Sequence, residues 1–99
     1  MGKFKFDKDF IYERSTKIGK IDTRGTIKDK SDRSLGKVSN NKIYDSRNKA
    51  IGEVRNGKIT ERGRTIGRVD DFEIDAFPRG KDAEMVACWH FLIEPIFED

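Results

Sequence analysis

The sequence predicts a mainly β fold in which residues 10–71 form four pseudo-symmetric β-hairpin units of about sixteen residues each. Three observations support this fold class. Four isoleucines recur at one constant spacing, a short apolar cluster follows each of them, and turn-forming residues separate the clusters. We expect the four units to close into a ring or barrel, and an apolar C-terminal segment to complete the core.

The first strand of each unit is an isoleucine followed two positions later by an acid. The isoleucines are Ile11, Ile27, Ile43 and Ile59, and the acids are Glu13, Asp29, Asp45 and Glu61. The second strand has the pattern aliphatic-Gly-x-aliphatic, with its glycine at Gly19, Gly36, Gly52 and Gly67. Both apolar clusters are too short for a helix and rich in β-branched residues, which is typical of strands.

The recurring glycine requires a structural reason, because glycine weakens the interior of a strand. We expect either a close approach of backbone or of an inserted segment, or a β-bulge at a tight bend. Turns such as Asn40-Asn41 and Asn56-Gly57 join the strands. A single hairpin is marginal in water, so the four hairpins must pack on one another, and closure would remove their free edges.

The remaining segments are expected to complete a single domain of residues 1–99. Residues 1–9 are predicted to form an N-terminal strand or arm. In the C-terminal segment 72–99, Phe72-Glu73-Ile74-Asp75 is similar to the start of a fifth unit that is not completed. Most positions from 83 to 97 are then apolar, which indicates burial. We expect a short helix with Asp82 as N-cap, followed by a strand or extended plug over 89–93.

The composition restricts the class of protein. Cys88 is the only cysteine, so neither an intrachain disulfide nor a cysteine-based metal site can form. No apolar run approaches the roughly 18 residues of a membrane span, and the first residues lack the apolar stretch of a secretory signal. We expect a soluble cytoplasmic protein without membrane contact, present as a monomer or weak homo-oligomer.

The repeats, followed by Ala87-Cys88-Trp89-His90-Phe91-Leu92-Ile93, resemble the bacterial β-flower proteins, specifically the four-fold type. The resemblance extends from Phe10 to Ile93. It implies a petal-like flower of four hairpins. It implies no established activity, so no catalytic residue can be transferred. The family typically has glycine in the turn after the acid, whereas here only Gly63 matches.

The four repeated acids are the first candidate for chemistry. Clustered carboxylates could bind a cation or transfer protons, which would make the protein a metal-dependent enzyme. Alternatively, each acid accepts hydrogen bonds from backbone N–H groups of the turn that follows it. We favour this structural role and predict no catalytic residue, no metal site and no cofactor. The pair Cys88 and His90 lies in an apolar segment without a third ligand, so we expect a core histidine bonded to a carbonyl.

The charge distribution is the second candidate. Residues 1–70 carry a net charge of +9 and residues 71–99 a net charge of −6, so the two parts could attract each other within the fold. The predicted basic rim consists of Lys20, Lys37, Arg64 and Arg68. It could be solvated, hold a protein partner or meet nucleic-acid phosphates, although exposed aromatic residues for base stacking are few. We predict a non-enzymatic binding or interaction module, with a nucleic-acid-associated protein as the alternative.

Overall fold

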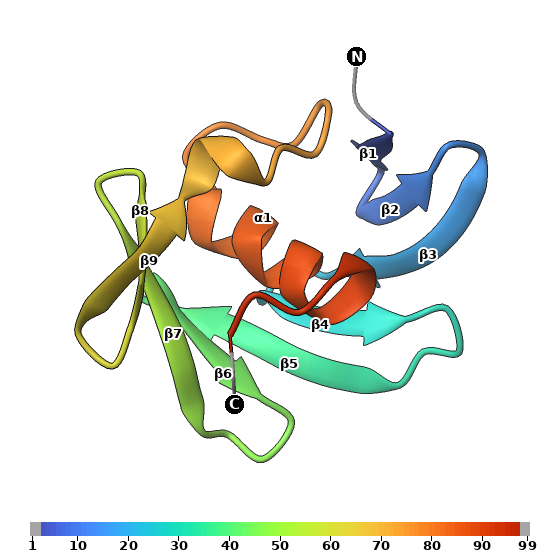
Figure 1. Cartoon of the computed structure of the whole chain (residues 1–99). Coiled ribbons are helices and arrows are strands. Elements are labelled where there is room, and N and C mark those ends of the chain that lie inside the picture. The colour runs from blue at the N-terminus through green and yellow to red at the C-terminus, as the bar shows by residue number, and fades with distance from the viewer. Residues whose placement is uncertain (1–2, 98–99) are drawn as a thin grey trace.

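The computed structural model describes residues 3–97 as nine antiparallel strands in one sheet, with a short helix at the centre of its concave side (Figure 1). Each strand pairs with the next one along the chain. Residues 1–2 and 98–99, the ends of the predicted arm and C-terminal segment, lie outside the described residues. The elements are β1 (Phe4–Asp7), β2 (Phe10–Glu13), β3 (Thr16–Ile21), β4 (Thr26–Asp29), β5 (Ser34–Ser39), β6 (Lys42–Asp45), β7 (Ala50–Arg55), β8 (Lys58–Glu61), β9 (Arg64–Arg68), the 3-10 helix Val69–Asp71, α1 (Asp82–Cys88) and a π-helical turn (Trp89–Ile93).

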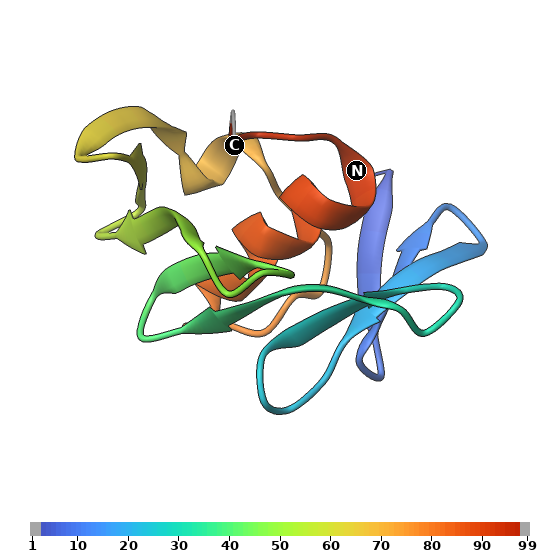
Figure 2. The same ribbon diagram turned by 90° about the horizontal axis from the view of Figure 1, so that it is seen from below.

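Each predicted unit is one hairpin, formed by β2–β3, β4–β5, β6–β7 and β8–β9. In every hairpin the isoleucine of the first strand faces the glycine of the second, as in Ile43↔Gly52. The register shifts directly after this pair in all four units. The aliphatic residue before the glycine is therefore the extra residue of a β-bulge, which bends and twists the hairpin. Figure 1 shows the hairpin tips pointing away from α1 like petals, and Figure 2 shows the same hairpins from below.

The core lies between the concave side of the sheet and the C-terminal segment. All four repeat isoleucines are fully buried, and Val86, Ala87 and Cys88 of α1 are buried with them. Burying one isoleucine side chain contributes about 1.5–3 kcal/mol, so the repeat supplies a large share of the apolar stabilisation. Among residues 3–97, no helix combines the length and apolar character that crossing a lipid bilayer requires.

The C-terminal segment is helical from residue 82 to residue 93, so the predicted strand or extended plug over 89–93 is wrong. The chain passes directly from α1 into the π-helical turn, which ends where the Glu94 N–H donates to the Trp89 carbonyl at 2.9 Å. Packing against the sheet overrides the strand preference of these aromatic and β-branched residues. The predicted cap is also wrong, because Lys81 is the N-cap and Asp82 is the first helical residue.

The hairpins do not close into a ring, because β1 and β9 remain the two edges of an open sheet. The edge of β1 is covered by a parallel bridge between Lys5 and Asp75. In this bridge the Phe6 N–H donates to the Asp75 carbonyl at 2.8 Å, and the Asp75 N–H donates to the Phe4 carbonyl at 2.9 Å. After β9 the chain enters the 3-10 helix Val69–Asp71 instead of another strand. The predicted closed fourfold ring is therefore wrong, and the nine strands form an open sheet.

β1 occupies the place of the second strand of a hairpin, but residues 3–97 contain no first strand for that hairpin. Phe6 of β1 faces Ile11, just as the last aliphatic residue of the first three hairpins faces the isoleucine of the next strand. Phe4 consequently stands where the other units have their glycine. Ile74, which is 3% exposed, follows Ile59 at nearly the spacing of the repeat and lies directly before the bridge to β1. The N-terminal strand and the segment 74–75 thus meet at a fifth position.

Candidate binding surfaces

The centre of the sheet is filled by the C-terminal segment. Three of the repeat glycines lie so close to it that an added Cβ atom would overlap a side chain. The pairs are Gly19 with Leu92, Gly36 with Phe91, and Gly52 with Phe97. Gly67 differs, since its nearest neighbour would be a Phe72 ring atom at 3.6 Å, an ordinary contact distance. The repeated glycines of the first three hairpins therefore accommodate the tail, and two of them also allow close approach of the neighbouring strand, because an added Cβ would lie 2.7 Å from the Lys28 carbonyl oxygen at Gly19 and 2.5 Å from that of Tyr44 at Gly36.

His90 holds the last part of this segment in place. Its Nδ1 accepts hydrogen bonds from the Ile96 N–H at 2.8 Å and from the Phe97 N–H at 3.2 Å. Its ring also packs on Phe97, with 5.1 Å between the ring centroids. A ring nitrogen that accepts from N–H donors carries no proton, so a proton on this ring lies on Nε2. This arrangement positions the Phe97 ring over Gly52.

Cys88 is fully buried in the helix that carries it. Burial, with a smaller contribution from the Glu84 carboxylate, raises the pKa of the Cys88 thiol far above its ordinary value. A thiol of this kind stays protonated and is a poor nucleophile or metal ligand. Within the described part of the chain, no three His, Cys, Asp or Glu side chains are grouped so that they could hold a metal ion.

Two of the repeated acids stabilise the turns that follow them. The Asp29 carboxylate accepts hydrogen bonds from the N–H groups of Ser31 at 2.8 Å and Arg33 at 3.0 Å. Asp45 does the same with the residues two and four positions further on, at 2.9 and 3.0 Å. This confirms the predicted structural role for these two aspartates. Asp22, in the loop between the first two hairpins, forms the same pair of bonds and was missed because it lies outside the repeated acid position.

The two glutamates of the repeat belong to a shorter kind of turn. Two residues follow Glu13 and Glu61 before the next strand, whereas four residues follow each aspartate. The Glu13 carboxylate lies 3.3 Å from Lys3 Nζ in an exposed ion pair. The choice between aspartate and glutamate therefore follows turn length, and the two aspartates act within their own hairpins.

The predicted basic rim is divided between two parts of the molecule. Lys20 and Lys37 lie on the neighbouring hairpins of β3 and β5, where Lys20 Nζ is 3.0 Å from Asp32 Oδ1. That contact and the nearby charge of Lys28 hold the pKa of Asp32 below its usual value. Arg64 and Arg68 lie on β9, on the opposite side of α1 in Figure 1. The four residues thus do not form one rim.

Lysines and aromatic residues gather on the convex side of β1–β6. They alternate with the buried isoleucines and therefore point away from α1. Lys17 Nζ lies 4.3 Å from the Phe10 ring centroid, and Lys37 Nζ lies 5.7 Å from that of Tyr44. These aromatic residues could not be recognised as part of a binding surface from the sequence alone, because the sequence does not reveal the cross-strand register that places lysines beside them. We call this surface the outer face, made of Lys5, Phe10, Tyr12, Lys17, Lys20, Lys28, Lys37 and Tyr44.

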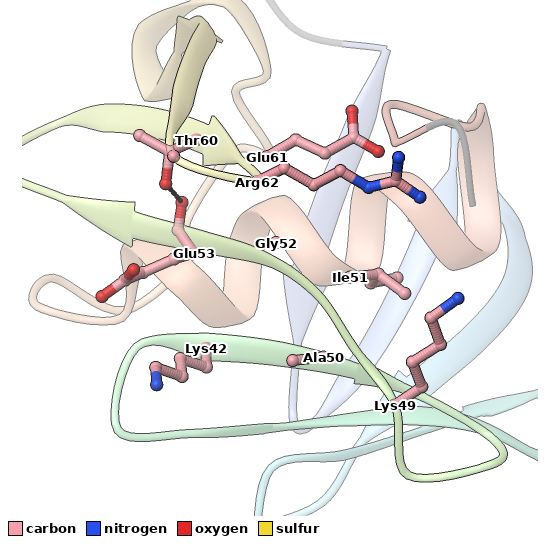
Figure 3. A pocket seen from close by; sticks show the side chains of 10 residues that line it. Lys42, Lys49, Ala50, Ile51, Gly52, Glu53, Thr60, Glu61 and Arg62 are labelled. Carbon is pink, nitrogen blue, oxygen red and sulfur yellow. Dashed lines mark hydrogen bonds between the residues drawn. The ribbon is translucent and has the colours of Figure 1, made fainter.

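A hollow of about 250 Å³ lies between the third and fourth hairpins (Figure 3). Its charged lining includes Lys42, Lys49 and Arg62 together with Glu53 and Glu61. Thr60 lies at one side of the hollow, where its Oγ1 donates to the Glu53 carbonyl at 3.3 Å. Because both signs of charge line the hollow, it has no strong preference for an anion or a cation.

These features define a small β-repeat protein with a filled centre and a charged, aromatic outer face. Residues 7–81 match the family described as the 5-fold beta-flower protein, and the chain belongs to that family. No curated protein and no solved structure matches the chain. The predicted β-flower family is confirmed, but the predicted four-fold type is not supported.

Proposed function

We propose that this protein is a non-enzymatic binding module that holds a protein partner on its outer face. The observation that carries the proposal is the pairing of lysines with half-buried aromatic rings, Lys17 with Phe10 and Lys37 with Tyr44. The other repeated positions serve folding. Isoleucines fill the core, glycines accommodate the tail and two aspartates stabilise turns.

The chemistry of the outer face favours a partner with an acidic surface. A lysine whose ammonium group already lies over an aromatic ring loses little further freedom on binding, and both Lys17 and Lys37 remain exposed to a partner. Aromatic rings next to cations are typical of residues that dominate binding energy at protein interfaces. The partner would place carboxylates near the lysines and apolar groups against Phe10 and Tyr44.

Site-specific photocrosslinking tests this proposal. A photoreactive phenylalanine analogue at Tyr44 should capture a recurrent acidic protein in cells. Lys17→Glu with Lys37→Glu should abolish the crosslink, whereas Arg79→Glu with Lys81→Glu, an identical charge change at exposed positions outside the outer face, should leave it intact. A crosslink that survives the Lys17/Lys37 variant, or the absence of any recurrent crosslink, would contradict the proposal.

A nucleic-acid partner is the second candidate, supported by the lysines that surround Phe10 and Tyr12. Lys5 faces Tyr12 from β1, Lys17 faces it from β3, and Lys20 faces Phe10. Aromatic rings can stack on nucleic-acid bases, and the lysines beside them can contact the phosphates. Fluorescence anisotropy with a labelled thymidine oligonucleotide at about 50 mM salt should show binding that weakens steeply as salt rises. Absence of binding at this salt concentration removes the candidate.

A non-catalytic role implies that the repeated acids stabilise their turns and take no direct part in binding. Asp29 and Asp45 already accept two backbone hydrogen bonds each. Substituting both by Asn should change stability alone and leave partner capture unchanged. Loss of partner capture in a folded Asp29→Asn, Asp45→Asn variant would instead give these acids a direct role in binding.

The proposal places the protein in the cytoplasm. A single free thiol, as at Cys88, suits the reducing conditions of that compartment.

A further inference from the structure

The two edges of the open sheet differ in how they are protected. The edge of β1 carries the parallel bridge to Asp75, whereas β9 is the last strand in the order of the sheet. Every residue of β9 except Gly67 is exposed. An unprotected edge presents backbone donors and acceptors to which another strand can add.

Ile66 makes this edge apolar at its centre. It is 39% exposed and is the one large hydrophobic side chain exposed among residues 3–97. At the equivalent bulge position, Ile18 and Leu35 are half-buried and Ile51 is 5% exposed. Those three residues lie in hairpins that are followed by another hairpin, while nothing follows β9 in the sheet. Ile66 is therefore the repeat position that the chain itself leaves uncovered.

Two arginines decide which strand can add to β9. Arg64 and Arg68 stand two residues on either side of Ile66, and both are exposed. Antiparallel pairing with a second copy about Ile66 would bring Arg64 and Arg68 of both chains together along one short strand pair. Gathering four positive charges there destabilises the pairing, so the edge disfavours its own copy. The same charges attract a strand that carries carboxylates at both ends.

We propose that β9 binds an extended acidic segment of a partner protein by strand addition. Main-chain hydrogen bonds along β9 supply affinity, an apolar residue of the segment covers Ile66, and flanking carboxylates pair with Arg64 and Arg68. This inference rests on the proposed function as a binding module and names a second surface and the chemistry of the segment that it takes.

A pair of synthetic peptides tests the proposal on the unmodified protein. The first is a blocked heptapeptide with two glutamates at each end and three valines between them. The second has the same sequence but is N-methylated at all three valines, which removes their backbone donors and keeps the charge. In ¹⁵N-labelled protein the first peptide should protect β9 amides from hydrogen exchange and bind at least tenfold more tightly than the second. Equal binding of the two peptides, or no protection of β9, overturns the proposal.

Charge-reversed variants locate the peptide site. Arg64→Glu with Arg68→Glu should weaken binding of the first peptide at least tenfold, and Ile66→Ser should weaken it severalfold. Arg79→Glu with Lys81→Glu should change it less than twofold. If Lys17→Glu with Lys37→Glu removes peptide binding and the β9 variant does not, strand addition is wrong and the outer-face proposal stands. If β9 is protected while the Tyr44 crosslink fails, the outer-face proposal is wrong and strand addition stands.

Discussion

The ring of Phe97 lies directly against the backbone of Gly52, so that a methyl group added to this glycine would overlap the ring. The three atoms nearest to that added Cβ all belong to Phe97. This contact joins the third hairpin to the end of the chain. It makes the glycine at this position a requirement of tertiary packing, since Gly52 is absent from the glycines with positive φ.

Alanine substitutions at equivalent glycines should therefore have different effects. Gly52→Ala should lower the free energy of unfolding by about 1–3 kcal/mol, the usual cost of overfilling a packed core. Gly67→Ala should change it by less than about 1 kcal/mol, because its added Cβ meets only an ordinary contact with Phe72. Urea denaturation of both variants measures the difference. Equal losses at the two positions would mean that the glycines serve a local backbone requirement.

The turn after β6 should depend on the carboxylate that precedes it. Asp45→Ala removes the acceptor for the N–H groups of Arg47 and Lys49 and should cost about 1–2 kcal/mol. Asp45→Asn keeps an acceptor oxygen and should lose less than half as much. Thermal or urea denaturation compares the two variants. If the Asn variant is as unstable as the Ala variant, the negative charge of Asp45 matters more than its hydrogen bonds.

The ion pair between Lys20 and Asp32 should set the titration of Asp32. The hydrogen bond and charge of Lys20, with the charge of Lys28, hold the pKa of Asp32 below the ordinary value of 3.8. Lys20→Met should move the pKa of Asp32 back toward 3.8, measured by carboxyl ¹³C NMR. Lys81→Met should leave it unchanged. An unaltered Asp32 titration in the Lys20 variant would show that the pair does not form in solution.

The lowered pKa of Asp32 determines how the stabilisation by this ion pair depends on pH. The folded-state pKa of Asp32 is lower than the unfolded value, so stabilisation is fully present above about 3.8 and is lost as pH falls through the folded pKa. The stability difference between the wild type and Lys20→Met should therefore disappear in acid. Because Asp32 is fully exposed, this difference is expected to be small.

Cys88 should report the opening of the core. Its thiol is fully buried, and burial raises its pKa, so a thiol-reactive disulfide reagent at pH 8 should not label the native protein. Labelling should become fast only as urea unfolds the chain, with the same midpoint as circular dichroism. Rapid labelling in the absence of denaturant would mean that α1 separates from the sheet under native conditions.

The sequence was sufficient to predict the four hairpins, because their signals are local. An isoleucine opposite a glycine and an acid before a turn recur in every unit, and asparagines adopt positive φ in several of the turns. The turn roles of Asp29 and Asp45 followed from the same local chemistry. The β-bulge was one of two reasons considered for the recurring glycine, and the structure contains both reasons.

The parts that could not be predicted depend on contacts between distant segments. β1 lacks the glycine of the other units because Phe4 stands in its place, where its ring packs on Trp89 at 5.1 Å between centroids. Its partner Asp75 lies in the segment recognised as the start of an incomplete fifth unit, but no local signal connects that segment to β1. The π-helical turn at 89–93 likewise depends on the sheet beneath it, since its sequence alone favours a strand.

A double-mutant cycle at Gly52 and Phe97 tests most directly whether the glycines exist to accommodate the C-terminal segment. Phe97→Ala removes the ring that an alanine at position 52 would overlap. The loss of unfolding free energy caused by Gly52→Ala should then fall from about 1–3 kcal/mol to below about 0.5 kcal/mol in the Phe97→Ala background. A loss that remains the same in both backgrounds would contradict the account, because Gly52 would then be required by the hairpin itself.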